Sequence, residues 1–227
     1  NFVVMWFGAF YPWYRIEELL DSILTLSKHK DFKFIVVGGK NPFNPNPDFY
    51  RQYEKAVAFS EKHDLTNKSL FFVDHVPFDT RINWFRHADV VISLNQEGSE
   101  NAFAWRTRVM DMVLWGQAVT LTNGGAPISE LLLDAGAALR LKKLSAAELT
   151  NTLELIRENR DMLHARGQRL ENLLRFVIGR FAVAFHDYDP AVGSFYLEAA
   201  HFSMTLNLRL ADFLGGSSLG FSSGSVG

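Results

Sequence analysis

The chain has 227 residues, of which 48% are hydrophobic and 21% are charged, and its formal net charge at pH 7 is −2. This composition excludes wholesale disorder, and the near-neutral charge gives no sign of a nucleic-acid or anionic-membrane surface as the main partner. The absence of cysteine excludes a disulfide framework, a thiolate metal site and a cysteine nucleophile.

Strand-like and helix-like segments alternate from the N-terminus to about residue 142. Short apolar runs predict strands at 2–7, 32–38, 69–73, 89–94, 118–122 and 137–141. Amphipathic spacing and start signals predict helices at 15–28, 49–63, 78–88, within 97–119, and at 127–136 and 145–174.

Continuous apolar strands that are each followed by a helix predict a parallel sheet covered on both faces. Right-handed crossovers make this an α/β, doubly wound, Rossmann-like sheet of about six strands, with its ligand at the carboxyl ends of the strands. We expect a Rossmann-like ligand-binding domain at 1–144, C-terminal helices at 145–214 and a flexible Gly/Ser-rich tail at 215–227.

The start of the sequence and its apolar runs bear on whether the chain is part of a longer protein and where it is located. It begins "NFVVMWFGAF", without Met and inside a predicted strand, which indicates a piece of a longer protein. Its longest apolar run, 173–185, contains two arginines and is shorter than the ~20 residues of a membrane span. We therefore expect no transmembrane segment and a cytoplasmic location, either free or at the membrane periphery.

Several catalytic and cofactor motifs are missing. The first strand is followed by "GAFYPW" rather than G-x-G-x-x-G, and the sequence contains no P-loop motif. It also lacks H-E-x-x-H and G-x-S-x-G, and its seven histidines are scattered. Ordinary dinucleotide, P-loop, metal and serine-nucleophile sites are therefore not expected.

Candidate binding residues instead follow the first and fourth strands. Gly8 permits a close backbone approach, and Tyr14 and Arg15 follow in the same loop. The aromatic side chains of this loop either pack against neighbouring helices or stack on a ligand.

In "EGSENAFAWRTRVMDMVLWGQAV" (97–119), Ser99 or Asn101 can cap a helix that starts after Gly98. The free N–H groups at such a helix start form an anion site. Farther along, Arg106, Arg108 and Asp111 stand in an otherwise apolar stretch, where Arg108 and Asp111 can share a helix face. These charges either form an internal structural pair or line a cleft for an anionic, hydroxylated ligand.

The order of these segments resembles the donor-binding half of GT-B fold glycosyltransferases, closest to family 4. The stretch "ADVVISLNQEGSENAFAWRTRVMDMVLWGQAVTLTNGGAPISELL" (88–132) is similar to the family's "aDv-v--S--E", apolar helix with an acidic residue, and "G-PVv-t--Gg--e-i". Its R-T-R-x-x-D is similar to a subgroup hallmark, and "HVPFDTRINWFRHADV" (75–90) matches the segment before strand four. The resemblance spans roughly residues 3 to 165.

The resemblance implies roles for individual residues. Asp111 corresponds to the acidic residue that accepts hydrogen bonds from the ribose hydroxyls. Strict spacing places Phe103 at the family's first acidic position, so Glu100 is the better candidate for the catalytic contact with the donor sugar. The backbone amides of Gly98, Ser99 and Asn101 would hold the diphosphate or the sugar.

The family's cationic diphosphate clamp is an Arg and a Lys after the first strand. Here those positions hold Ala9 and Tyr14, so Arg15, Arg106 or Arg108 would have to supply the positive charge.

The implied function is retaining transfer of a sugar from a nucleoside diphosphate sugar to an acceptor hydroxyl. No metal or other cofactor is required if the protein supplies the positive charge. The partners are the nucleotide sugar and, through a missing N-terminal domain, an acceptor glycan or lipid-linked sugar, so the fragment alone is expected to be inactive. A nucleotide-sugar epimerase of similar fold and a non-catalytic nucleotide-binding or interaction module are the alternatives.

Overall fold

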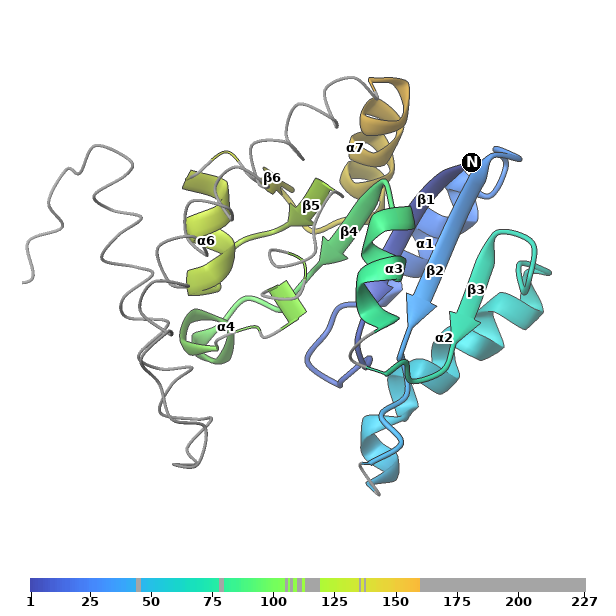
Figure 1. Ribbon diagram of the computed structural model, residues 1–227, viewed down its shortest axis with the longest axis horizontal. Helices are drawn as coiled ribbons and strands as arrows, with labels where there is room; N and C mark the ends of the chain where they lie inside the picture. Colours follow the sequence, from blue (N-terminus) through green and yellow to red (C-terminus); the bar gives the residue numbers. More distant parts are fainter. Residues whose placement is uncertain are drawn as a thin grey trace, which may run out of the picture. The chain divides into compact units, whose positions relative to one another are not determined.

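The computed structural model describes residues 1–43, 46–77, 80–104, 106, 108–109, 112, 119–134, 136 and 138–159. All of them belong to one compact unit, Asn1–Leu174. They build an α/β fold with a six-stranded sheet in the order β3-β2-β1-β4-β5-β6, in which every pairing is parallel (Figure 1). This arrangement confirms the predicted doubly wound, Rossmann-like fold. The predicted helices beyond residue 159 and the predicted tail lie outside the described residues, and the domain boundaries stay predictions.

Each strand lies within the residues predicted for it. The strands are β1 (Phe2–Phe7), β2 (Phe32–Val37), β3 (Leu70–Val73), β4 (Val90–Ser93), β5 (Val119–Thr122) and β6 (Ala138–Arg140). On one side β1 pairs with β2 from Phe2↔Phe32 to Phe7↔Val37, and on the other side it pairs with β4. The strand order therefore reverses between β1 and β4, and ligands of such sheets bind at the carboxyl ends of the strands near this reversal.

The helices that connect the strands also follow the predicted order. They are α1 (Glu17–Leu26), the 3₁₀ helix η1 (Pro47–Phe49), α2 (Arg51–Lys62), α3 (Arg81–His87), α4 (Ser99–Phe103), α6 (Pro127–Asp134) and α7 (Ala146–Glu158). The helix α7 starts where the sequence predicts it, because the Ser145 hydroxyl accepts a hydrogen bond from the Glu148 amide and so caps the helix.

Side chains of β1 contribute to apolar cores on both faces of the sheet. Val4 and Trp6 belong to a core cluster shared with α1 and α7, whereas Met5 and Phe7 belong to a second cluster shared with α3 and α6. Successive side chains of a strand point to opposite faces, so a strand that is covered on both sides must be apolar throughout. This is the physical reason for the uninterrupted apolar run at the start of the chain.

The prediction of one helix within 97–119 is wrong in part. The helix α4 ends at Phe103, and Ala104 is extended, with φ −77° and ψ 122°. The backbone is helical again at Arg108. The break lies directly before Arg106, whose guanidinium turns back to bond side chains of α4. A buried guanidinium needs such partners, and a continuous helix would not bring them to it.

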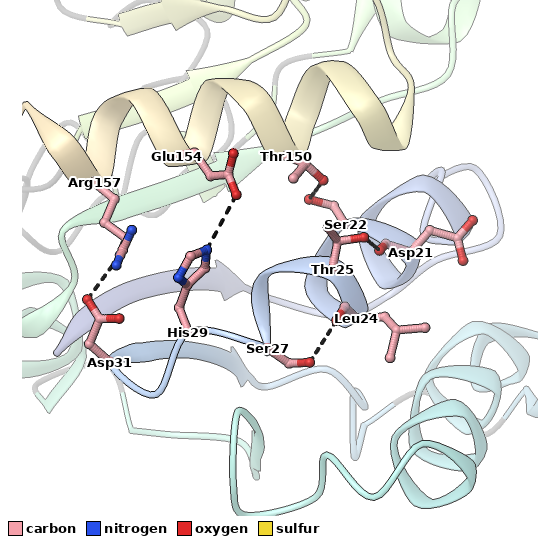
Figure 2. Close-up of polar contacts among 10 residues, drawn as sticks. All are labelled: Asp21, Ser22, Leu24, Thr25, Ser27, His29, Asp31, Thr150, Glu154 and Arg157. Carbon is pink, nitrogen blue, oxygen red and sulfur yellow. Dashed lines mark hydrogen bonds and ion pairs between the residues drawn. The ribbon is translucent and has the colours of Figure 1, made fainter.

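The helices α1 and α7 pack against each other through polar contacts as well as through the core (Figure 2). The buried Thr150 hydroxyl donates to the Ser22 hydroxyl at 3.0 Å. At the C-terminal end of α7, Arg157 Nε donates to Asp31 Oδ2 at 3.0 Å, after the end of α1, and Glu154 and His29 lie between the two bonds. These contacts attach α7 to α1 and to the loop before β2.

We expect the Arg157→Met variant to be slightly less stable than wild type at pH 7 and equally stable in strong acid. The hydrogen bond from Arg157 lowers the pKa of Asp31 below its ordinary value of 3.8. A lowered pKa in the folded state contributes stability above pH 3.8, and this contribution is lost as the pH falls through the lowered value. Because the pair is solvent-accessible, its contribution is within the range of about 0–1 kcal/mol.

Thermal unfolding of wild type and Arg157→Met at pH 7 and in strong acid, below the lowered pKa of Asp31, measures this difference. The Asp31→Asn variant is the matched control, since it removes the same pair from the other side. A difference in melting temperature that is the same at both pH values would rule out the ion pair as its cause.

Candidate functional site

A cleft of about 320 Å³ opens at the carboxyl ends of β1, β2 and β3. Its lining residues come from the loops after these strands, from α3 and from the segment after α4: Phe7, Gly8, Ala9, Tyr11, Val37, Gly38, Asn41, Phe43, His75, Val76, Arg81 and Arg108. The cleft lies at the sheet edge where doubly wound folds bind ligands. Its volume falls at the lower end of the range for ligand pockets, about 300–1,000 Å³.

Gly8 forms part of the cleft floor in a conformation that favours glycine. Its φ is +98°, and its amide donates to the carbonyl of Val37 at 2.8 Å. A Cβ at this position would lie 3.4 Å from Arg108 Nη2. The missing side chain therefore leaves room for the arginine and exposes backbone to the cleft.

Arg108 is held against aromatic rings at the inner side of the cleft. Its guanidinium lies 4.3 Å from the centre of the Tyr14 ring and 5.0 Å from that of Trp6. Its Nη2 donates to the carbonyl of Ala9 at 3.1 Å. Burial lowers the pKa of Arg108 from its ordinary value, but a guanidinium keeps its charge in proteins.

The second nitrogen of that guanidinium has no partner among the described residues. Arg108 Nη1 is buried and makes no hydrogen bond in this part of the structure. No carboxylate of the described residues forms an ion pair with it either. Arg108 thus places at the cleft a positive charge that no described carboxylate pairs with, together with a buried nitrogen that has no hydrogen-bond partner in the same part of the chain.

Arg81 is a second arginine of the cleft. It is the first residue of α3, and its guanidinium lies 5.7 Å from the centre of the Phe7 ring. The described lining residues include no aspartate or glutamate. The cleft therefore favours an anion.

Arg106 belongs to a different cluster, which joins α4 to the loop after β5. It is 7% exposed, and its Nη2 donates to Glu100 Oε2 at 2.5 Å and to Asn101 Oδ1 at 3.2 Å. The Asn101 amide in turn donates to the carbonyl of Gly124 at 3.0 Å. These bonds tie α4 to the loop after β5 and pair the charge of Arg106 with Glu100, although its buried Nε has no hydrogen-bond partner among the described residues.

Arg15 is the third candidate cation from the sequence. Its side chain is exposed and pairs with Glu18 one turn later in the chain. It does not line the cleft. Of the three arginines considered as replacements for the missing clamp, the structure brings Arg108 to the cleft.

The predicted side-chain caps of α4 are wrong. The helix starts after Gly98, which has φ +144°, and no side chain caps it. Ser99 is its first residue, and the side chain of Asn101 is engaged by Arg106 and Gly124. The Asn101 side chain links Arg106 to the loop after β5, so it is not available as a cap. A contact of the Gly98, Ser99 and Asn101 amides with a ligand stays a prediction.

Tyr14 lies behind Arg108 rather than in the cleft lining. It is buried, and its ring packs edge-on against Trp6 with the centroids 5.2 Å apart. Next to it, Tyr11 and Trp13 stack with their centroids 4.7 Å apart. The aromatic loop thus acts partly as packing, with Tyr11 reaching the cleft.

Asp111, the predicted ribose ligand, lies outside the described residues.

Asn41, Phe43 and Arg81 are among the cleft residues that the sequence did not identify. A signal existed for Arg81, because a basic residue near the start of a helix that follows a strand lies at the ligand edge of such a sheet. Asn41 and Phe43 stand in a Pro- and Asn-rich loop whose course the sequence does not determine.

Two further features concern metals and membranes. Among the residues that the structure describes, no group of three or more His, Asp or Glu side chains is arranged to hold a metal ion. Within the same residues, no helix has the length and apolar character needed to cross a membrane.

The sequence matches no protein-family model and no curated protein significantly. Solved structures do match its fold. The C-terminal domain of a group 1 family glycosyltransferase (LpcC) from Francisella tularensis aligns with a TM-score of 0.59 at 15% identity, over 79% of this chain and 86% of that one. Anabaena Alr3699/HepE in complex with UDP and glucose aligns with a TM-score of 0.62 at 14% identity, over 95% of this chain and 48% of that one.

Sucrose-phosphate synthase from Thermosynechococcus elongatus is similar with a TM-score of 0.57 at 12% identity, over 82% of this chain and 46% of that one. The described residues therefore have the fold of the C-terminal half of GT-B glycosyltransferases, as the resemblance in sequence implied. This chain spans about half the length of HepE and of sucrose-phosphate synthase.

Proposed function

We propose that this chain is the donor domain of a retaining glycosyltransferase and binds a nucleoside diphosphate sugar in the cleft after β1, β2 and β3. One observation carries the proposal. At the ligand edge of the sheet, the described lining combines two arginines, exposed glycine backbone and no carboxylate. HepE, which shares the fold, has been solved with UDP and with UDP-glucose, and this supports a ligand of the same class.

Arg108 takes the place of the family's missing clamp. Its Nη1 is the free donor, and the carbonyl of Ala9 together with the Tyr14 and Trp6 rings orients the guanidinium before a ligand arrives. As the bond from the donor sugar to the diphosphate breaks, negative charge builds on the leaving phosphate. A fixed cation in a water-poor position stabilises that charge with little reorganisation and lowers the barrier to transfer.

Glu100 is proposed as the contact to the donor sugar, as the resemblance implies. Its side chain is 57% exposed on α4 and is oriented by Arg106. The acceptor hydroxyl would come from a glycan or lipid-linked sugar bound by another part of the full-length protein.

The first test is titration of the chain with UDP, GDP and ADP, followed by calorimetry or saturation-transfer NMR. We expect at least one diphosphate to bind, uridine to bind much more weakly, and affinity to fall with added salt, because the diphosphate charge drives binding. With UDP-glucose as the ligand, Glu100→Gln should weaken binding more than it does with UDP. Absence of binding by all three diphosphates would refute the proposal.

A non-catalytic nucleotide-binding module is the second candidate. It is favoured by Ala9 and Tyr14, which stand where the resembling enzymes carry their clamp, and by the internal pairing of Arg106. Such a module would bind UDP as tightly as a catalytic donor domain, so UDP affinity does not distinguish the two candidates. Release of UDP from UDP-glucose by the full-length protein, and its loss in Arg108→Gln, would identify the enzyme.

A further inference from the structure

The outer end of the cleft carries an exposed aromatic pair that the diphosphate does not account for. Phe43, in the loop after β2, is 79% exposed. His75, in the loop after β3, meets it edge-on, with ring centroids 5.3 Å apart and planes at 87°. Single exposed apolar side chains are common, but this one lines the same cleft as the two arginines.

The loop that carries Phe43 is held in place by Asn41. The Asn41 side-chain oxygen accepts the Phe43 amide at 3.0 Å, and its nitrogen donates to the Tyr11 hydroxyl at 3.3 Å. The Tyr50 hydroxyl donates to the Asn41 carbonyl at 2.9 Å. One bond within the loop and two to other parts of the chain, at Tyr11 and Tyr50, fix the loop before any ligand binds. A ring that is presented in this way loses little conformational entropy when a ligand covers it.

The aromatic end and the cationic end of the cleft are separated along the sheet edge. His75 follows β3, whereas Arg108 donates to the Ala9 carbonyl just after β1, and β2 lies between these strands. Neighbouring strands are about 4.8 Å apart, so the two ends lie on the order of 10 Å from each other. A nucleoside diphosphate has the same polarity, with a planar base at one end and the charged phosphates at the other, joined by the ribose.

We propose that Phe43, backed edge-on by His75, is the stacking platform for the base of the nucleotide, and that Asn41 positions it. This inference rests on the proposed function, because it presumes that the diphosphate lies at the Arg108 end. Every nucleobase has a π-face, so the platform contributes affinity without selecting among bases. Selection among bases then depends on other groups.

The test compares UDP, ADP and inorganic pyrophosphate as ligands of wild type, Phe43→Ala and Phe103→Ala at low ionic strength. Phe103 is the matched control, since it is 87% exposed and does not line the cleft. We expect Phe43→Ala to lower the affinities for UDP and ADP by about 10-fold, as loss of one base stack does. Pyrophosphate, which has no base, should bind the Phe43→Ala protein as it binds wild type, and Phe103→Ala should change neither affinity.

Two further readouts test the geometry directly. In saturation-transfer NMR, the base protons of UDP should receive more saturation than the ribose protons with wild type, and lose this excess with Phe43→Ala. Phe43→Trp should bind UDP as wild type does. Asn41→Ala should lower the affinity for UDP without lowering the affinity for pyrophosphate.

The outcomes separate the platform from the proposed function. If wild type binds UDP and Phe43→Ala binds it equally well, the platform is wrong and the donor site stands. An equal loss of UDP and pyrophosphate in Phe43→Ala would also overturn the platform, because it would mean general damage to the cleft. If wild type binds neither ligand, both proposals fail.

Discussion

Replacing Arg108 with Gln is expected to lower the affinity for UDP by about 10- to 100-fold, the loss associated with one hydrogen bond to a charged group, ~1.5–3 kcal/mol. The expectation depends on the position of this one side chain. It is anchored by the Ala9 carbonyl and stacked on Tyr14, and its Nη1 is left with no partner among the described residues. Glutamine keeps some of the packing and removes the charge.

The other two candidate arginines provide the controls. Arg15→Gln removes an exposed side chain that pairs with Glu18, and it should change neither stability nor UDP affinity measurably. Arg106→Gln breaks the bonds to Glu100 and Asn101, so it should lower the melting temperature and leave UDP affinity nearly unchanged.

Arg108→Lys should recover part of the lost affinity, because it restores the charge without the planar donor geometry. Calorimetric titration of the four variants at one salt concentration gives the comparison. A larger loss of affinity in Arg106→Gln than in Arg108→Gln would move the clamp to the α4 cluster and contradict the assignment.

The sheet was predictable because its strands are buried on both faces. A run such as that of β1, whose side chains enter two separate cores, has to be apolar at every position. Runs of this kind, separated by amphipathic helices, define both the strand boundaries and the parallel pairing. The position of the ligand edge follows from the same topology, which is why Gly8 could be named from the sequence.

The partners of the charged residues were less predictable. Arg106 and Arg108 are two residues apart in a stretch with apolar periodicity, yet one bonds α4 and the other reaches the loop after β1. Their different surroundings depend on the end of the helix α4 at Phe103 and the extended backbone of Ala104, which no local signal in the sequence indicates. The same holds for Phe43, whose loop is held by the hydrogen bond that Asn41 donates to the Tyr11 hydroxyl and by the one that the Tyr50 hydroxyl donates to the Asn41 carbonyl.

Trp6→Ala is expected to destabilise the fold by about 3–5 kcal/mol, the usual cost of removing a large buried aromatic side chain. Trp6 is fully buried, with its ring 4.9 Å from that of Phe10, and its indole Nε1 donates to the Gly8 carbonyl at 2.9 Å. The same ring is one of the two on which Arg108 lies. Trp6 therefore connects the core to the cleft, and the variant should lose UDP affinity as well as stability. Chemical denaturation and UDP titration measure the two effects.

Two substitutions separate these effects. Phe32→Ala empties an equally buried position at the opposite end of the sheet, where β2 begins, so it should cost a similar ~3–5 kcal/mol and leave the UDP affinity of the folded protein unchanged. Trp6→Phe keeps most of the core volume and removes the hydrogen bond to Gly8, so its cost should be about 1 kcal/mol. Because the guanidinium then loses part of its aromatic support, UDP affinity should still fall in Trp6→Phe. If Trp6→Phe binds UDP as wild type does, the contact between the Trp6 ring and the Arg108 guanidinium contributes to folding alone.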